Sequence, residues 1–151
     1  MPVRYFALIL GVVFLLVGLL GFVPGINQVH HSMHPDMRVD GPGTGYLLGL
    51  FPVNVLHNLI HILFGIWGIV AYRRFADSRM YARGVAIIYG IFTIMGLIPV
   101  LNTAFGLVPI YGNDIWLHGL IAIVSAIFGW APMERTESWR HIPPHTGAHG
   151  V

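Results

Sequence analysis

The chain has 151 residues, of which 56% are hydrophobic and only 9% are charged. A typical soluble domain is about 25% charged, so this composition excludes a soluble enzyme, a nucleic-acid-binding protein and a disordered tail. The formal net charge of +2 is too small to indicate an anionic partner. The chain contains no cysteine, which excludes disulfides, thiol catalysis and cysteine-ligated metal centres. The composition therefore indicates a small integral membrane protein whose first partner is the lipid bilayer.

Four segments are apolar enough to cross a bilayer, which requires roughly 20 residues per helix. They cover residues 5–23, 53–72, 84–101 and 115–131, and none contains Asp, Glu, Arg or Lys. The first is longer than the apolar core of a signal peptide and lacks a small-x-small cleavage site, so we expect it to be retained. The sequence thus predicts a four-span domain over residues 1–131, with an outer loop at 24–45 and a tail at 132–151.

The positions of the arginines predict the orientation of the chain, because positively charged loops stay in the cytoplasm. Seven of the eight arginines lie before the first span, between the second and third spans, or after the fourth. Only Arg38 lies in the other two loops. We therefore expect both termini, and with them the tail, to be cytoplasmic.

Two stretches of the chain repeat. Residues 21–27 (GFVPGIN) match residues 96–102 (GLIPVLN), and residues 57–62 (HNLIHI) match residues 118–123 (HGLIAI). Each repeat covers one helical hairpin, and parallel repeats of this kind are related by a pseudo-two-fold axis along the membrane normal. The sequence predicts an all-α fold, a membrane four-helix bundle of two similar hairpins, in which His57 and His118 are equivalent.

Small and polar residues gather on one face of two spans. At about 100° per residue, one face of the second span carries Asn54, His57, Asn58, His61, Gly65 and Gly68. One face of the fourth span carries Asp114, His118, Ala122, Ser125 and Gly129. Because small residues allow close helix packing and polar ones bond across helix interfaces, we expect both faces to point inward.

Three ionisable residues lie inside the spans: His57, His61 and His118. All lie near the outer surface, and neutral imidazole is a ligand for haem iron, pigment metals and transition metals. These histidines are the candidate cofactor-binding residues, with Asn54, Asn58 and Asp114 as candidate partners that orient the rings. Two other interpretations are open: the histidines bond between the hairpins, with Asn113 and Asp114 as ordinary helix caps, or they line a proton or substrate pathway.

The outer loop has a second, weaker candidate metal site. His30, His31 and His34 are interspersed with Met33 and Met37, and imidazole with thioether sulfur suits copper. The spacing is loose, and a solvated loop is the competing interpretation.

Three segments together resemble a known family. They are residues 18–24 (GLLGFVP), 49–61 (GLFPVNVLHNLIH) and 113–118 (NDIWLH). They are similar to the small bacterial four-helix membrane proteins grouped as domain of unknown function 4383, over roughly residues 3–131. The resemblance implies the bundle fold and a bacterial inner-membrane location. It also draws attention to His57, His61 and His118, which lie in the matching segments, but it implies no activity.

Three functions fit these observations. The first is a non-enzymatic accessory or structural membrane subunit, with other membrane subunits or further copies of the chain as partners, because the chain is small and has no catalytic motif. The second is a membrane protein that binds haem, a pigment or a metal through its histidines. The third is a small transporter or channel, which would require an oligomer because four spans make a thin pathway.

Overall fold

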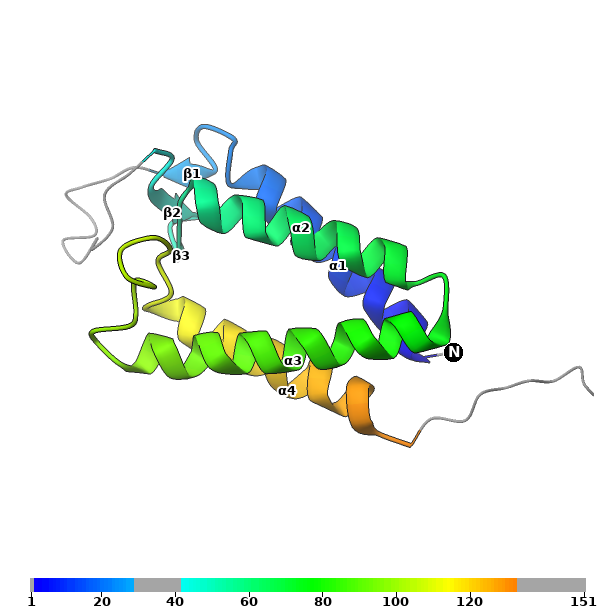
Figure 1. The fold of residues 1–151 in the computed structure, drawn as a ribbon. Helices are drawn as coiled ribbons and strands as arrows, with labels where there is room; N and C mark the ends of the chain where they lie inside the picture. Colours follow the sequence, from blue (N-terminus) through cyan, green and yellow to red (C-terminus); the bar gives the residue numbers. More distant parts are fainter. Residues whose placement is uncertain (1, 29–41, 133–151) are drawn as a thin grey trace, which may run out of the picture.

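The computed structural model describes residues 2–28 and 42–132. These residues form four α-helices, namely α1 (Pro2–Leu20), α2 (Val55–Ala71), α3 (Phe75–Leu97) and α4 (Asn113–Trp130). The helix α1 packs along α2, and α3 packs along α4, so that two hairpins lie against each other (Figure 1). The predicted all-α four-helix bundle of two hairpins is confirmed.

Three very short strands cover one end of the bundle. They are β1 (Asn27–Gln28), β2 (Gly45–Leu47) and β3 (Phe51–Val53), and they pair antiparallel in the order β1-β2-β3. Leu48 and Gly49, both at positive φ, make the turn between β2 and β3. The sequence did not predict these strands, since two or three residues are too few to show alternation. We call this end of the bundle the sheet end.

The helices start and end at other residues than the apolar segments suggest. Residue 53 belongs to β3, so α2 begins only at Val55 and has 17 residues. The helix α3 begins at Phe75, well before residue 84, because its first turns are amphipathic rather than apolar. It ends at Leu97, since Ile98 is extended, as expected for a residue that precedes proline.

Three of the helices, α1, α3 and α4, are long and apolar enough to cross a membrane, whereas α2 is a shorter apolar helix. Large apolar side chains cover the outside of all four helices. A lipid environment satisfies this surface, because lipid chains are as apolar as the side chains that face them. The chain is therefore a membrane protein by composition and by surface.

Glycines bring α1 and α2 into backbone contact. A Cβ atom on Gly11 would lie 2.8 Å from the backbone nitrogen of Ile69 and 2.9 Å from the carbonyl oxygen of Gly65. A Cβ atom on Gly68 would lie 2.8 Å from the carbonyl oxygen of Ala7. No larger residue fits at these positions unless the two helices move apart.

The centre of the bundle displays the internal repeat. The rings of Phe14 and Tyr89 stack at 5.2 Å between centroids, and the two residues are 75 positions apart, which is the offset of the repeat. The buried positions of α1 and α3 correspond at that offset: Val3, Ala7, Gly11 and Phe14 match Ser78, Ala82, Ala86 and Tyr89. The burial pattern and the stacked rings therefore agree with the repeat seen in the sequence.

Arginines close the opposite end, which we call the arginine end. Arg4 at the start of α1 donates to the carbonyl oxygen of Tyr72 beyond α2, at 2.8 Å. Arg83 near the start of α3 donates to the carbonyl oxygen of Gly129 near the end of α4, at 2.9 Å. Cations stabilise carbonyls left unpaired at helix C-termini, and each hairpin uses the same device.

Candidate metal site between the hairpins

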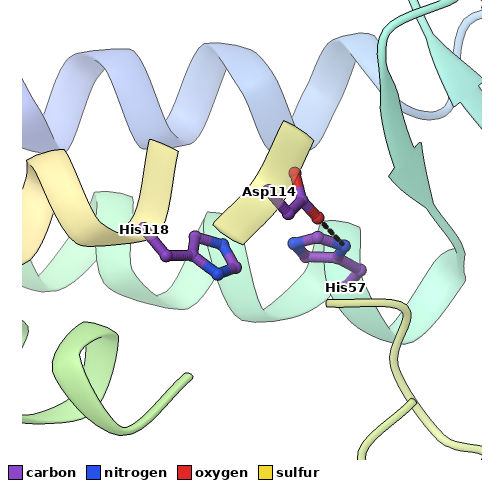
Figure 2. A group of neighbouring side chains, drawn as sticks. All are labelled: His57, Asp114 and His118. Carbon is purple, nitrogen blue, oxygen red and sulfur yellow. Dashed lines mark ion pairs between the residues drawn. The ribbon is translucent and has the colours of Figure 1, made fainter. Parts of the chain in front are cut away.

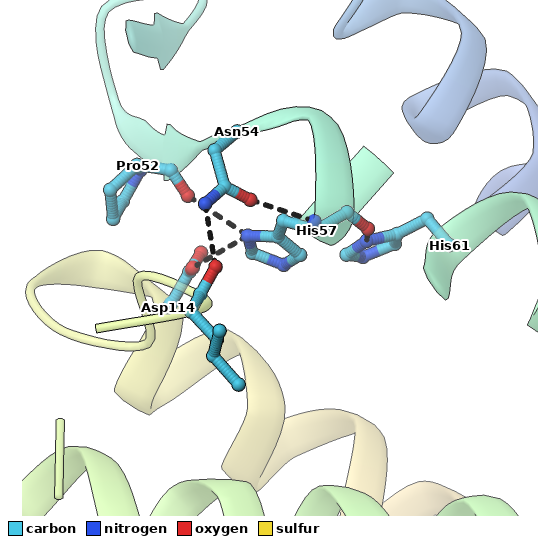
Figure 3. A network of polar contacts seen from close by, with 6 residues as sticks. Pro52, Asn54, His57, His61 and Asp114 are labelled. Atoms are coloured by element: carbon cyan, nitrogen blue, oxygen red, sulfur yellow. Dashed lines mark hydrogen bonds and ion pairs between the residues drawn. The ribbon is translucent and has the colours of Figure 1, made fainter. Parts of the chain in front are cut away.

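The first turn of α2 is fixed by Asn54. Its side-chain oxygen accepts a hydrogen bond from the backbone N–H of His57 at 2.8 Å, and its amide nitrogen donates to the carbonyl oxygen of Leu107 at 2.7 Å (Figure 3). The first bond caps the helix, and the second joins the first hairpin to the loop of the second. Asn54 therefore holds the backbone of His57. The sequence had instead predicted a contact between Asn54 and a histidine ring.

The first turn of α4 is built differently from the prediction. The N-cap residue is Gly112, at φ 66°, and no side chain caps the helix. Asn113 instead donates to the carbonyl oxygen of Leu50 in the first hairpin at 3.1 Å. Asp114 is only 2% exposed. The expectation that Asn113 and Asp114 are ordinary caps was wrong, because the positive-φ glycine takes the cap position and Asp114 is left in the buried first turn.

Three buried side chains from the two hairpins converge near the sheet end. His57 of α2 and Asp114 and His118 of α4 each offer one ligand atom, and these atoms all lie within 4.8 Å of one another (Figure 2). His57 Nδ1 lies 3.9 Å from Asp114 Oδ2, and the His57 and His118 ring centroids are 6.1 Å apart. We call these three residues the cluster. Asp114, predicted to orient a ring or to cap the helix, is thus a member of the cluster itself.

The protonated nitrogen of His57 follows from its hydrogen bond. Nδ1 lies 3.1 Å from the carbonyl oxygen of Pro52 (Figure 3). A carbonyl only accepts, so Nδ1 carries the proton and Nε2 keeps a lone pair. Figure 2 shows Nε2 on the side of the ring that faces His118. Metal-binding histidines typically donate their second ring nitrogen to a carbonyl or carboxylate in this way. The Pro52 carbonyl left no signal in the sequence, because every residue carries one.

His61 lies one turn further along α2, next to the cluster. Its Nδ1 donates to the carbonyl oxygen of His57 at 3.0 Å, so its Nε2 also keeps a lone pair. Its ring centroid is 4.6 Å from that of His57, and the edge of its ring packs against Phe14. The structure therefore brings the three predicted histidines together.

Two atoms of the cluster are buried without a hydrogen-bond partner among the described residues: Asp114 Oδ2 and His118 Nδ1. An unsatisfied buried polar atom costs about 1–3 kcal/mol, so each calls for an explanation. The rings of Tyr89 and Phe92 pack around His118, with the Tyr89 centroid at 5.0 Å. These aromatic rings fix the His118 imidazole, but no hydrogen bond satisfies its Nδ1.

Asn58, another expected partner of the histidines, forms no hydrogen bond with them. Neither polar atom of its amide has a partner among the described residues. A Cβ atom on Gly21 would lie within 2.4 Å of the amide carbon of Asn58, so this side chain fills the space at the end of α1. Asn58 of α2 therefore packs against Gly21 at the end of α1 and does not orient a histidine ring.

Two imidazoles and one carboxylate form a ligand set for a transition metal ion. An ion about 2.0–2.2 Å from each ligand atom requires the three atoms to lie closer together than the 4.8 Å limit within which they now lie. The cavity beside the cluster has a volume of about 120 Å³. Organic cofactors occupy pockets of about 300–1,000 Å³, so this cavity suits an ion and not a haem or pigment ring.

The second predicted metal site, His30, His31 and His34, lies outside the described residues. The same holds for most of the predicted tail at 132–151. The candidate site that the structure describes is therefore the cluster with His61 beside it.

Comparison with known proteins gives a family and no activity. Neither the search of curated proteins nor the search of solved structures found a match to the chain. The match to a family model extends over residues 4–131, which includes all four helices except the first two residues of α1, and the whole cluster. The chain therefore belongs to the family described as a domain of unknown function, DUF4383.

Proposed function

We propose that this protein is a non-enzymatic membrane protein that binds one divalent transition metal ion between its two hairpins. The ligands are His57, Asp114 and His118. The observation that carries the proposal is the pair of unsatisfied buried atoms, Asp114 Oδ2 and His118 Nδ1, beside a histidine whose proton is already committed to Pro52. A metal ion satisfies such atoms and neutralises the buried carboxylate, which is otherwise costly to hold in an apolar interior.

The alternative, that the histidines serve as hydrogen-bonded links between hairpins, fits the contacts less well. The ring bonds of His57 and His61 go to carbonyls of their own hairpin, at Pro52 and His57. Asparagines make the polar links between the hairpins, from Asn54 to Leu107 and from Asn113 to Leu50. The imidazoles are thus left available for another role, and metal binding uses the free Nε2 of His57 and the unpartnered Nδ1 of His118.

We further propose that the site opens to the outside of a bacterial inner membrane. Arg4, Arg79 and Arg83 bind carbonyls at the arginine end, opposite the cluster. Since arginine-rich ends stay in the cytoplasm, both termini are cytoplasmic and the sheet end faces outward. The shorter helix α2 crosses as well, because it packs along α1 in the same hairpin. The metal is therefore taken from the extracytoplasmic side.

Cobalt substitution tests the proposal. The full-length protein is purified in a mild detergent, stripped with a chelator and titrated with Co²⁺, whose visible absorption reports the ligands directly. We expect one Co²⁺ per chain with the spectrum of nitrogen and oxygen ligation. We expect His118→Ala to lower the affinity by more than about 100-fold, since loss of a partner outside the ligand set already lowers it by about 10–100-fold.

The matched control is His145→Ala, which removes a histidine of the C-terminal tail. It should leave the stoichiometry and the spectrum unchanged. If the wild-type protein binds no Co²⁺, or if His118→Ala binds it as tightly as the wild type, the proposed metal site is wrong.

A further inference from the structure

The cavity beside the cluster has two kinds of wall. The polar lining residues, which we call the polar wall, are the three histidines and Asp114. The apolar lining residues, which we call the apolar wall, are Val17, Leu47, Leu48, Phe51, Val53 and Leu117. Two residues of the apolar wall are partly accessible at the surface: Leu48 is 61% exposed and Leu117 is 36% exposed.

The cluster leaves metal coordination positions free. Two histidines and one carboxylate occupy three positions, and this set with open positions is characteristic of Fe(II) centres that bind small molecules. The described residues add only His61 to the polar wall. Its Nδ1 is tied to the carbonyl oxygen of His57, so even with its Nε2 bound an Fe(II) ion would keep room for another ligand.

The size and chemistry of the cavity restrict what this ligand can be. A volume of about 120 Å³ holds an ion and a molecule of a few atoms, whereas organic substrates need about 300 Å³ or more. The apolar wall carries no side-chain donor or acceptor and no charge. An anion or a hydrogen-bonding ligand would lose its hydration there without compensation, while a neutral diatomic molecule loses very little.

We propose that the site, with Fe(II) bound, takes up a neutral diatomic ligand such as nitric oxide in its open coordination position. This inference rests on the proposed metal site and specifies what the metal is for. Binding forms one iron–nitrogen bond and displaces a bound water, and no electron has to enter or leave. The non-enzymatic protein would then serve as a receptor for a diatomic molecule that dissolves in the membrane.

Nitric oxide itself is the probe. The full-length protein in detergent is loaded with Fe(II) without oxygen, freed of excess iron and exposed to nitric oxide. The EPR spectrum of a high-spin ferrous nitrosyl should appear in proportion to the bound iron. His118→Ala should lose both the iron and the signal.

A variant of the apolar wall separates ligand access from metal binding. Val17→Phe places a ring at a residue that lines the cavity, and Val13→Phe makes the same change on the exposed side of α1, where Val13 is 46% exposed. We expect Val17→Phe to retain its iron and lose the nitrosyl signal at a nitric oxide concentration that saturates the wild type. Val13→Phe should behave like the wild type.

The two proposals fail in different ways. If the wild-type protein binds neither Co²⁺ nor Fe(II), the metal site is wrong and the inference is wrong with it. If Fe(II) binds at the cluster but the wild-type protein gives no nitrosyl signal, the metal site stands and the diatomic ligand is wrong. A nitrosyl signal that persists in Val17→Phe would show that the ligand does not enter this cavity.

Discussion

Replacing Asp114 by asparagine distinguishes two possible roles of this side chain, as a metal ligand and as a structural hydrogen-bond acceptor. The two side chains have nearly the same shape, so Asp114→Asn removes the charge with little change in packing. Asp114 Oδ2 is buried and has no hydrogen-bond partner among the described residues, and a buried unsatisfied group costs about 1–3 kcal/mol. Without metal, the variant should therefore be as stable as the wild type or more stable by up to that amount.

The addition of metal should reverse this order. At a free metal concentration of 100 Kd, binding to the folded state alone raises the free energy of unfolding by about 2.7 kcal/mol. The ligands come from both hairpins, so the unfolded chain does not present them together. The wild type should show this gain and Asp114→Asn should lose it. The measurement is denaturant unfolding in detergent micelles, with chelator and with Zn²⁺.

Asp77→Asn in α3 is the matched control, since this helix also carries an aspartate in its first turn. It loses at most about 0.3–1 kcal/mol of favourable interaction with the helix dipole, and its gain from metal should equal that of the wild type. The reasoning is refuted if Asp114→Asn is less stable than the wild type by more than about 1 kcal/mol with chelator and the wild type gains nothing from metal. Asp114 would then be a structural acceptor.

Three further outcomes follow from the packing and the ligand chemistry. Gly11→Ala should destabilise the protein in the same unfolding assay by about 1–3 kcal/mol, because a Cβ there meets the α2 backbone at 2.8 Å; Gly90→Ala, with open space around its Cβ, should instead stabilise α3 by about 0.5–1 kcal/mol. Asn54→Ala should cost about 1–3 kcal/mol from the lost cap and the orphaned Leu107 carbonyl, and replacing the exposed Leu56 by Ala should cost less. The Co²⁺ affinity should fall as the pH is lowered, because imidazole ligands must lose a proton to bind; an affinity independent of pH would argue against histidine ligands.

The bundle could be predicted because membrane helices show their inward faces in the sequence. The small residues Gly65 and Gly68 fall on the polar side of α2, and both are buried in contact with α1. The ends of the elements could not be predicted in the same way. Hydropathy averages over many residues, so it does not register a three-residue strand such as β3 or the amphipathic first turns of α3.

The sequence predicted the histidines of the candidate site, whereas it predicted Asp114 only as an inward-facing partner or helix cap. His57, His61 and His118 stand out because ionisable residues are rare inside membrane spans. Asp114 falls on the inward face of the fourth span, but it follows Asn113 at the start of a helix, a position where aspartate is ordinary, so the pattern does not distinguish a cluster member from a cap. Gly112, whose φ is positive, is the N-cap residue of α4. The spacing of apolar and polar residues does not predict backbone angles, so this cap could not be predicted.

The internal repeat explains how such a site arises between two similar hairpins. His57 and His118 are equivalent at the offset of 61 residues, and their ring centroids lie 6.1 Å apart in a T-shaped arrangement. At the same offset, Asp114 matches Val53 and His61 matches Ala122. The carboxylate and the third imidazole thus occur once each, where the repeat is broken. A symmetric pair of neutral ligands holds a dication weakly, whereas one added carboxylate supplies charge and leaves the opposite side apolar. In the proposed metal site, this asymmetry supplies one charged ligand, while the apolar residues that line the cavity, Val53 among them, supply none.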